Sequence, residues 1–311
     1  MLRVEVEIFS GRPNPAWIIT DESAVRTLLS EVADAAEDVV GLPHEGSDGL
    51  GYREVVLSAV SDDQVWPTPL PREFALGTTG ARDVARSTEL ARKVVSGMTR
   101  HVATPLREHR STPLDAGMRD LVLREIDRFA DAPPPFFRPQ RLPSHPSVGT
   151  APAPEAAPEP TAACLVELGN YNPAFWNRPE VQPQNNCYNY AGDRRTDTRA
   201  QPGRAHGHEF QAHTCLDLTN AILIDGLVRS TQCLPDSENP RWFLAMVIWP
   251  GTDFHFYRKH QELFWGHKPG SDTARNYDNS GVRITNPETA NRGPYTDFCG
   301  YFFMGRSVVI R

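Results

Sequence analysis

A single cysteine lies among amide and aromatic side chains in the stretch Gln-Pro-Gln-Asn-Asn-Cys-Tyr-Asn-Tyr, residues 182–190. The run that begins at Cys187 has the spacing of a helix start. A thiol at a helix N-terminus lies near free backbone N–H groups and the positive end of the helix dipole. Both favour the thiolate, which is the form of cysteine that attacks carbonyl carbons. The sequence therefore predicts that Cys187 is the nucleophile of an acyl-transfer reaction.

Two histidines downstream of Cys187 could complete this chemistry. His255 lies on an expected strand, and His267 follows twelve residues later on the expected partner strand of a hairpin. Imidazole titrates near neutral pH and can take a thiol proton, while a second polar group must fix which ring nitrogen faces the sulfur. We expect His255 to be the base and His267 to orient it, with Asn276 or Asp278 as alternatives for the orienting role.

Two glutamines that precede the cysteine could stabilise a tetrahedral oxyanion. The side chain of Gln182 or Gln184 could donate an N–H group to that oxygen, beside the backbone N–H of Cys187.

The order of these residues resembles that of papain-like cysteine amidohydrolases, most closely the NlpC-type and CHAP-type families. The order is a cysteine at a helix start, a helix, a buried strand, then His255 and His267 on the next two strands. The resemblance covers residues 182–300, where Asn-Cys-Tyr-Asn at 186–189 stands in place of the families' usual Asp-Cys-Ser-Gly. It implies a papain-like α+β domain with an antiparallel sheet, in which Cys187 attacks an amide carbon and His255 acts as base.

The expected function is therefore that of a cysteine hydrolase or acyltransferase acting on an amide bond. A peptidase, an amidase and a transglutaminase-like enzyme all fit, with a peptide, a cell-wall peptide or a glutamine side chain as substrate. The proposed chemistry needs no cofactor.

Two other functions fit different residues. Three histidines and a cysteine crowd into ten residues and could bind zinc, namely His206, His208, His213 and Cys215. Alternatively, dense aromatic residues in the second half could form a non-enzymatic platform for carbohydrate or peptide. These aromatic residues are Tyr188, Tyr190, Trp242, Trp249, Phe254, Phe256, Tyr257, Phe264 and Trp265.

Composition narrows the possible partners and the compartment. The formal net charge of -7 argues against nucleic acid as a partner, and no apolar run approaches the roughly 20 residues needed to span a bilayer. Residues 1–7 alternate charged and apolar side chains like a strand rather than a signal peptide. Five cysteines are odd in number and too dilute for a disulfide scaffold, so we expect reduced thiols and a cytoplasmic protein, with signal-independent export as an alternative.

The elements that must position the candidate site fall into two predicted domains. Ten of the 31 residues from 132 to 162 are proline, which predicts an extended linker, or alternatively a docking motif for a proline-reading partner. The linker separates an N-terminal α+β domain of unknown role, residues 1–131, from the catalytic domain, residues 163–311.

Local patterns predict several elements within these domains. Residues 2–9 alternate like a strand, and residues 16–20 can return as a second strand after a Gly- and Pro-containing turn. Asp21 and Thr112 have the spacing of helix N-caps. Thr214 should cap a helix that is apolar nearly all round and hence buried, with Cys215 as an inert core residue.

Overall fold

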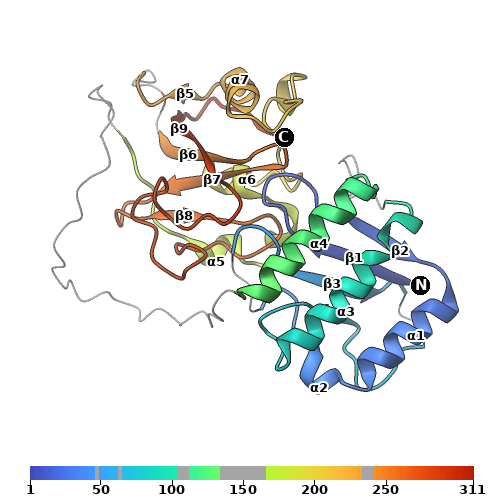
Figure 1. Cartoon of the computed structure of the whole chain (residues 1–311). Helices are drawn as coiled ribbons and strands as arrows, with labels where there is room; N and C mark the ends of the chain where they lie inside the picture. The colour runs from blue at the N-terminus through green and yellow to red at the C-terminus, as the bar shows by residue number, and fades with distance from the viewer. Residues whose placement is uncertain (46–48, 62–64, 104–111, 134–165, 233–237, 239–240) are drawn as a thin grey trace, which may run out of the picture.

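The computed structural model describes residues 1–45, 49–61, 65–103, 112–133, 166–232, 238 and 241–311. Within them the chain forms two antiparallel sheets, one in each half, with helices packed against both, so the expected α+β class is confirmed. The two halves, residues 1–133 and 166–311, lie side by side (Figure 1).

The N-terminal sheet is built around a strand that the alternating pattern of residues 2–9 predicts. Its strands are β1 (Leu2–Glu7), β2 (Ala16–Ile19), β3 (Glu54–Ala59) and β4 (Glu73–Leu76). Their order is β2-β1-β3-β4 and every neighbouring pair is antiparallel. In the register, Val4 lies opposite Trp17 of β2 and Leu57 of β3. The four residues of β4 are too few to show a period of two, so the strand is not predictable locally.

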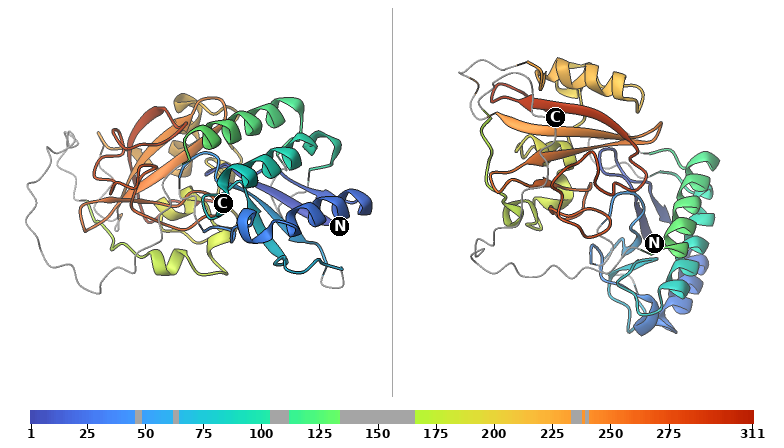
Figure 2. Two further views of the ribbon diagram at one scale, coloured as in Figure 1. Left: turned by 60° about the horizontal axis from the view of Figure 1, so that its bottom comes forward. Right: turned by 60° about the vertical axis from the view of Figure 1, so that its left-hand side comes forward.

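Helices cover one face of this sheet (Figures 1 and 2). They are α1 (Glu22–Ala33), α2 (Ala36–Val39), α3 (Val84–Ser96), the 3-10 helix η1 (Met98–Arg100) and α4 (Ala116–Asp131). The predicted cap of α1 is confirmed, since Asp21 accepts hydrogen bonds from the N–H groups of residues 23 and 24. The predicted cap of α4 is wrong. Asp115 directly precedes the helix and caps it by accepting the N–H of Met118, while the Thr112 hydroxyl donates to the carbonyl of Pro13.

The C-terminal sheet has five strands in the order β5-β9-β6-β7-β8, all antiparallel. They are β5 (Val228–Arg229), β6 (Trp242–Trp249), β7 (Asp253–Lys259), β8 (Trp265–His267) and β9 (Asp297–Met304). The central strand β6 is buried along nearly its whole length, as its continuous apolar run predicts. The hairpin of β7 and β8 brings Tyr257 opposite His267.

Short helical segments precede and flank this sheet. They are α5 (Pro173–Trp176), η2 (Gln182–Gln184), α6 (Cys187–Ala191), η3 (Arg204–His206) and α7 (Cys215–Asp225). Helices α6 and α7 pack on one face, against residues such as Leu244, Phe254 and Phe302. None of the described helices is both long and apolar enough to cross a membrane.

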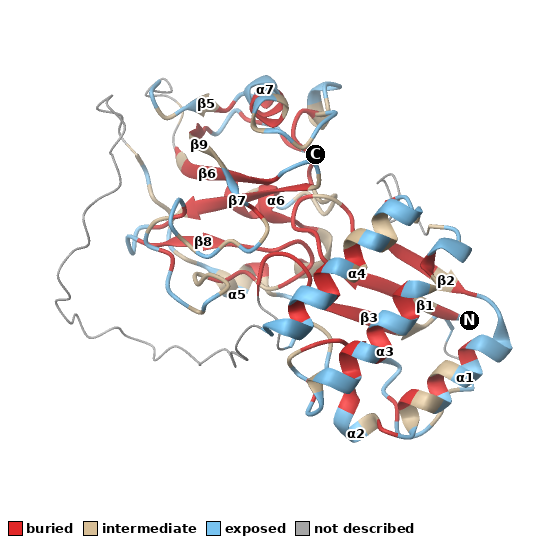
Figure 3. Ribbon diagram, viewed as in Figure 1, coloured by how far each residue is buried: buried red, intermediate tan, exposed pale blue. Residues whose placement is uncertain are grey.

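The prediction that α7 is buried all round is wrong. Leu218 and Ile222 are buried against the sheet, whereas Leu216 is 73% exposed and Ile224 is also exposed. In Figure 3 the ribbon of α7 carries both buried and exposed residues. One sheet face can cover only one side of a helix, and no other described element covers the outer side.

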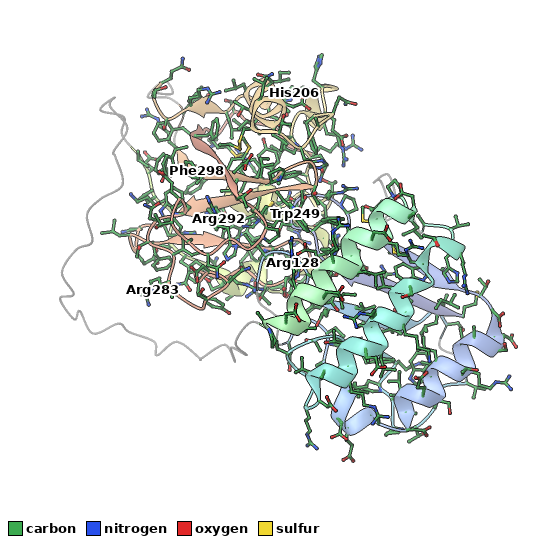
Figure 4. The ribbon with its side chains drawn as sticks, viewed as in Figure 1. Arg128, His206, Trp249, Arg283, Arg292 and Phe298 are labelled. Carbon is green, nitrogen blue, oxygen red and sulfur yellow. A yellow bond between two sulfur atoms is a disulfide. The ribbon has the colours of Figure 1, made fainter. Side chains whose placement is uncertain are left out.

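The opposite face of the C-terminal sheet shares a continuous apolar core with the N-terminal half. Trp249, labelled in Figure 4, contacts Phe9 with ring centroids 6.2 Å apart and Tyr295 with centroids 5.8 Å apart. The division into separate domains at 131 and 163 stays a prediction, because the proposed linker lies almost entirely outside the described residues.

A polar contact also joins the halves, through the turn at residues 10–15. Backbone N–H groups of residues 10–12 donate to the carboxylate of Asp253 at distances of 2.6 to 3.2 Å. The carbonyl of Gly11 accepts hydrogen bonds from Asn186 Nδ2 and Gln201 Nε2, both at 2.8 Å. We call this set of contacts the junction latch.

Glycine is needed at position 11 of the latch. A Cβ atom there would lie 2.5 Å from the ring of Phe254, which is far inside van der Waals contact. The turn is therefore the predicted connection between two strands and also the docking point for the second half of the chain.

One disulfide links Cys215 at the start of α7 to Cys299 in β9. The expectations that Cys215 is an inert core thiol and that the cysteines are mostly reduced are therefore wrong for this pair. Cys187 is the free cysteine among the described residues, while Cys164 and Cys233 lie outside them.

Candidate functional site

The stretch around Cys187 begins the short helix α6, as its spacing predicts. The Asn186 side chain caps the helix by accepting the N–H groups of Tyr188 and Asn189, and the Asn189 side chain accepts the Asn186 N–H in return. These amides also hold neighbouring loops, because Asn189 Nδ2 donates to the Arg194 carbonyl at 2.9 Å. The amide side chains next to the cysteine are therefore engaged in building the fold.

The Cys187 thiol is fully buried, and its sulfur lies 3.9 Å from the carbonyl oxygen of Phe254. Burial raises the pKa of the thiol well above its usual value, and the Asp253 carboxylate adds to the rise. Lys268 opposes the rise without overcoming it. The expected stabilisation of a thiolate at this helix start is outweighed, since α6 has only five residues and the sulfur is withdrawn from water.

His255 and His267 come together as expected. His255 Nε2 and His267 Nδ1 are 2.9 Å apart, and His267 Nε2 lies 3.0 Å from the Tyr277 carbonyl oxygen. Because a carbonyl only accepts, His267 carries its proton on Nε2 and accepts at Nδ1 from His255. Burial lowers the pKa of both rings, that of His267 to about 3, so both are neutral near pH 7.

Cys187 is not hydrogen-bonded to this histidine pair. Side chains alternate along β7, so Phe254 and Phe256 point toward α6 and pack with Cys187. His255 lies on the opposite face, where its ring centroid is 4.8 Å from that of Tyr257. The sheet backbone therefore separates the thiol from the imidazole that was expected to activate it.

Gln182 and Gln184 lie in η2 and are half-buried. The Gln182 carbonyl accepts from Lys268 Nζ, and the Gln184 carbonyl accepts from the Arg199 N–H. Within the described structure, neither side-chain amide is hydrogen-bonded to Cys187. The backbone carbonyls of both glutamines thus stabilise the fold, and among the described residues these two side chains do not form an oxyanion site with Cys187.

The alternative orienting residues lie elsewhere. The Asp278 carboxylate accepts backbone N–H groups of Ser280 and Val282, and the Asn276 carbonyl accepts the N–H of Ile284. The residue hydrogen-bonded to the His255 ring in the described structure is His267.

Lys268 is a buried cation that sequence reasoning missed. Its ammonium group donates to the carbonyls of Gln182, Asn185 and Gly270 at 2.5 to 2.6 Å, and burial lowers its pKa well below the usual value. Lys-Pro-Gly carries only the signal of a turn, so nothing local indicates this arrangement.

The four candidate zinc ligands do not converge. Cys215 is in the disulfide, and His206, labelled in Figure 4, pairs with Asp225 at 3.0 Å. His208 and His213 line a cleft described below. Within the described part of the chain, no group of three or more His, Cys, Asp or Glu residues could hold a metal ion.

The predicted aromatic platform is mostly core. Of the nine aromatic residues that suggested it, all except Trp242 are buried. A surface that binds a ligand must therefore use other residues.

An open cleft of about 880 Å³ lies where the two halves meet; we call it the junction cleft. The N-terminal half contributes the latch turn and the segment just before α4, and the C-terminal half contributes residues 201–213 and the outer side of α7. Its described lining residues are Arg12, Pro13, Thr112, Pro113, Gln201, Arg204, Gly207, His208, Glu209, Phe210, Gln211, His213, Asp217, Asn220, Ala221 and Ile224.

The lining of the cleft combines hydrogen-bonding groups with apolar surface and one aromatic ring. Nine of these sixteen residues carry planar polar side chains, which distributes hydrogen-bonding groups along the walls. The Phe210 ring is held by edge contacts with Phe254, 5.4 Å between centroids, and with His213, 5.1 Å. Such a surface can bind a ligand with many hydroxyl groups and a flat apolar face.

Comparison with known proteins gives one informative match. The chain is 43% identical over 141 residues to a protein of Ruditapes philippinarum described as insoluble matrix shell protein 1. The match covers 43% of this chain and 89% of that protein. No family model matches the chain, and no solved structure matches it.

Proposed function

The chain belongs to the family of insoluble matrix shell protein 1. We propose that it is a non-enzymatic module that binds a polysaccharide chain in the junction cleft. The observation that carries the proposal is the cleft itself. It is open, so a long polymer can enter and leave, and nine of its sixteen described lining residues carry planar polar side chains.

Two features favour saccharide over peptide as the ligand. Peptides are commonly held by main-chain pairing with an exposed strand, but the described lining of the cleft comes from turns, loops and α7. Planar side chains such as Asn220 and Gln211 can pair with sugar hydroxyls, while Phe210 offers a ring for the apolar face of a sugar.

An oxidising compartment outside the cytoplasm is part of the proposal. The disulfide between Cys215 and Cys299 supports it, because such bonds are rare in cytosolic proteins. The description of the relative as an insoluble matrix shell protein is compatible with such a compartment. The cytoplasmic location expected from the sequence is the alternative.

The test is calorimetric titration with two soluble hexasaccharides, neutral cellohexaose and an acidic hexauronate from alginate. Phe210→Ala and Asn220→Ala should each weaken binding about fivefold or more, the equivalent of ~1 kcal/mol. Phe298→Ala is the matched control, since Phe298 is also half-buried but lies on β9 outside the described lining (Figure 4). Absence of binding at millimolar saccharide, or equal binding by all variants, would rule out the cleft as a saccharide site.

Cysteine-dependent cleavage of an amide bond by a papain-like domain remains the second candidate. The hydrogen bond between His255 and His267 favours it, since a base and its orienting partner are what the mechanism needs. It ranks second because the thiol is buried with a raised pKa. Iodoacetamide should leave Cys187 unmodified in the native protein and modify it after unfolding. Rapid native labelling that is lost in His255→Ala would restore the enzyme hypothesis.

A further inference from the structure

We infer that the junction cleft selects acidic saccharides, and that Arg12 is the residue that binds their carboxylate or sulfate groups. The inference rests on the proposed saccharide function and adds the class of ligand. It follows from how Arg12 is held and from how the other charges of the cleft are used.

Arg12 is fixed at the cleft by three contacts, one from its backbone and two from its side chain. Its backbone N–H belongs to the junction latch and donates to Asp253 at 2.9 Å. Its Nη1 donates to the Thr252 carbonyl at 3.1 Å, and its guanidinium carbon lies 4.7 Å from the centre of the Phe9 ring. A guanidinium held in this way is preorganised, so a ligand loses little entropy in binding it.

The charge of Arg12 is not neutralised by an ion pair within the described residues. Asp253 is near, but its oxygens accept the three latch N–H groups and the hydroxyl of Tyr295. Burial lowers the pKa of Arg12 in spite of the attraction of Asp253, so the cation is partly withdrawn from water. An anionic group in the cleft would restore the interaction that burial removes.

The other charged groups that line the cleft are already engaged. Arg204 forms a bidentate ion pair with Glu209, in which Nε and Nη2 donate to the two carboxylate oxygens at 2.8 and 3.0 Å. The Asp217 carboxylate accepts the N–H groups of Gln211 and Ala212, each at 2.6 Å. Arg12 is therefore the cation of the described lining that remains open to a ligand anion.

Titration of the full-length chain with hexauronate and with cellohexaose separates the possible outcomes. The wild-type protein should bind hexauronate about tenfold or more tightly than cellohexaose, with a preference that falls as salt is added. Arg12→Gln should weaken hexauronate binding far more than cellohexaose binding and so remove the preference, and Arg12→Lys should keep part of it.

Arg178→Gln is the matched control, because Arg178 also lies over a phenylalanine ring, that of Phe175 at 5.2 Å, but outside the cleft. It should keep the wild-type preference. Equal binding of both hexasaccharides by the wild type, or an undiminished preference in Arg12→Gln, would overturn the role of Arg12 while the saccharide function stands. If neither hexasaccharide binds, the inference falls together with the proposed function.

Discussion

Buried ionisable side chains are concentrated where the two halves meet. Glu7 accepts hydrogen bonds from Arg53 at 3.0 Å and from the Ser271 hydroxyl at 2.5 Å. Burial alone would raise the pKa of Glu7, but the charges of Arg53, His44 and Arg199 together with the Ser271 hydrogen bond outweigh it and bring the pKa to about 2. The stability that Glu7 contributes is thus present above the ordinary pKa of 4.5 and is lost as the pH falls from there toward 2.

Glu54 has the opposite pH dependence and gives a prediction. Burial raises its pKa to about 7, and the nearby His44 offsets this only in part. A carboxyl with a raised pKa contributes stability that is present below its ordinary value of 4.5 and is lost as the pH rises through 7. Glu54→Gln should therefore be more stable than the wild type at pH 8, by at most about 3 kcal/mol, and nearly equal to it at pH 5.

Urea unfolding at both pH values measures this difference. Glu73→Gln, an exposed carboxyl on β4, is the control and should shift stability little at either pH. A Glu54→Gln variant that loses the same free energy of unfolding at pH 5 and pH 8 would contradict the assignment.

At the scale of elements, α7 shows how a covalent link supplements packing. Its outer side carries exposed apolar residues and lines the junction cleft, so only its inner side is held by the core. The disulfide attaches its first residue, Cys215, to β9 across 84 positions of sequence. A cross-link over such a distance restricts the unfolded chain strongly.

We predict that the double variant Cys215→Ser, Cys299→Ser is less stable than the wild type by about 2–4 kcal/mol. Reductant should lower the melting temperature of the wild type and leave that of the double variant unchanged. The measurement is differential scanning calorimetry with and without dithiothreitol. If full reduction of the disulfide leaves the wild-type melting temperature unchanged, packing alone holds α7 in place.

At the scale of the whole molecule, the two halves pack against each other. They share an apolar core, and the junction latch connects the turn at 10–15 to Asp253 through backbone hydrogen bonds. The cleft has walls from both halves, so a change in their association should also change the cleft.

Protease cleavage within residues 134–162 should therefore leave the wild-type halves associated on gel filtration. Gly11→Ala should weaken that association, because the added Cβ meets the Phe254 ring at 2.5 Å, and the expected cost is about 1–3 kcal/mol. Gly97→Ala is the control, since its Cβ would have its nearest contact at 3.6 Å. Separation of the nicked wild-type halves would instead support two independent domains.

Features that depend on a few neighbouring residues were predictable from the sequence. The α+β class, strands β1 and β6, the caps at Asp21 and Thr214 and the start of α6 at Cys187 follow from local spacing. The proximity of His255 and His267 was predictable too, because a hairpin places nearby positions opposite each other. The residues of the zinc hypothesis do not converge, and those of the aromatic-platform hypothesis are mostly buried. Their crowding in the sequence could not predict this, because composition does not specify which side chains meet or reach the surface.

Tertiary structure alone decided which residues separated in sequence meet. It put Cys187 and His255 on opposite faces of β7, paired Cys215 with Cys299, and brought the turn at 10–15 to Asp253. The physical reason is that side-chain direction in a sheet and docking between halves are set by register and packing over long sequence distances. The sequence by itself therefore determined those elements and caps that depend on local spacing, while the cleft and the open charge of Arg12 arose only when the two halves packed together.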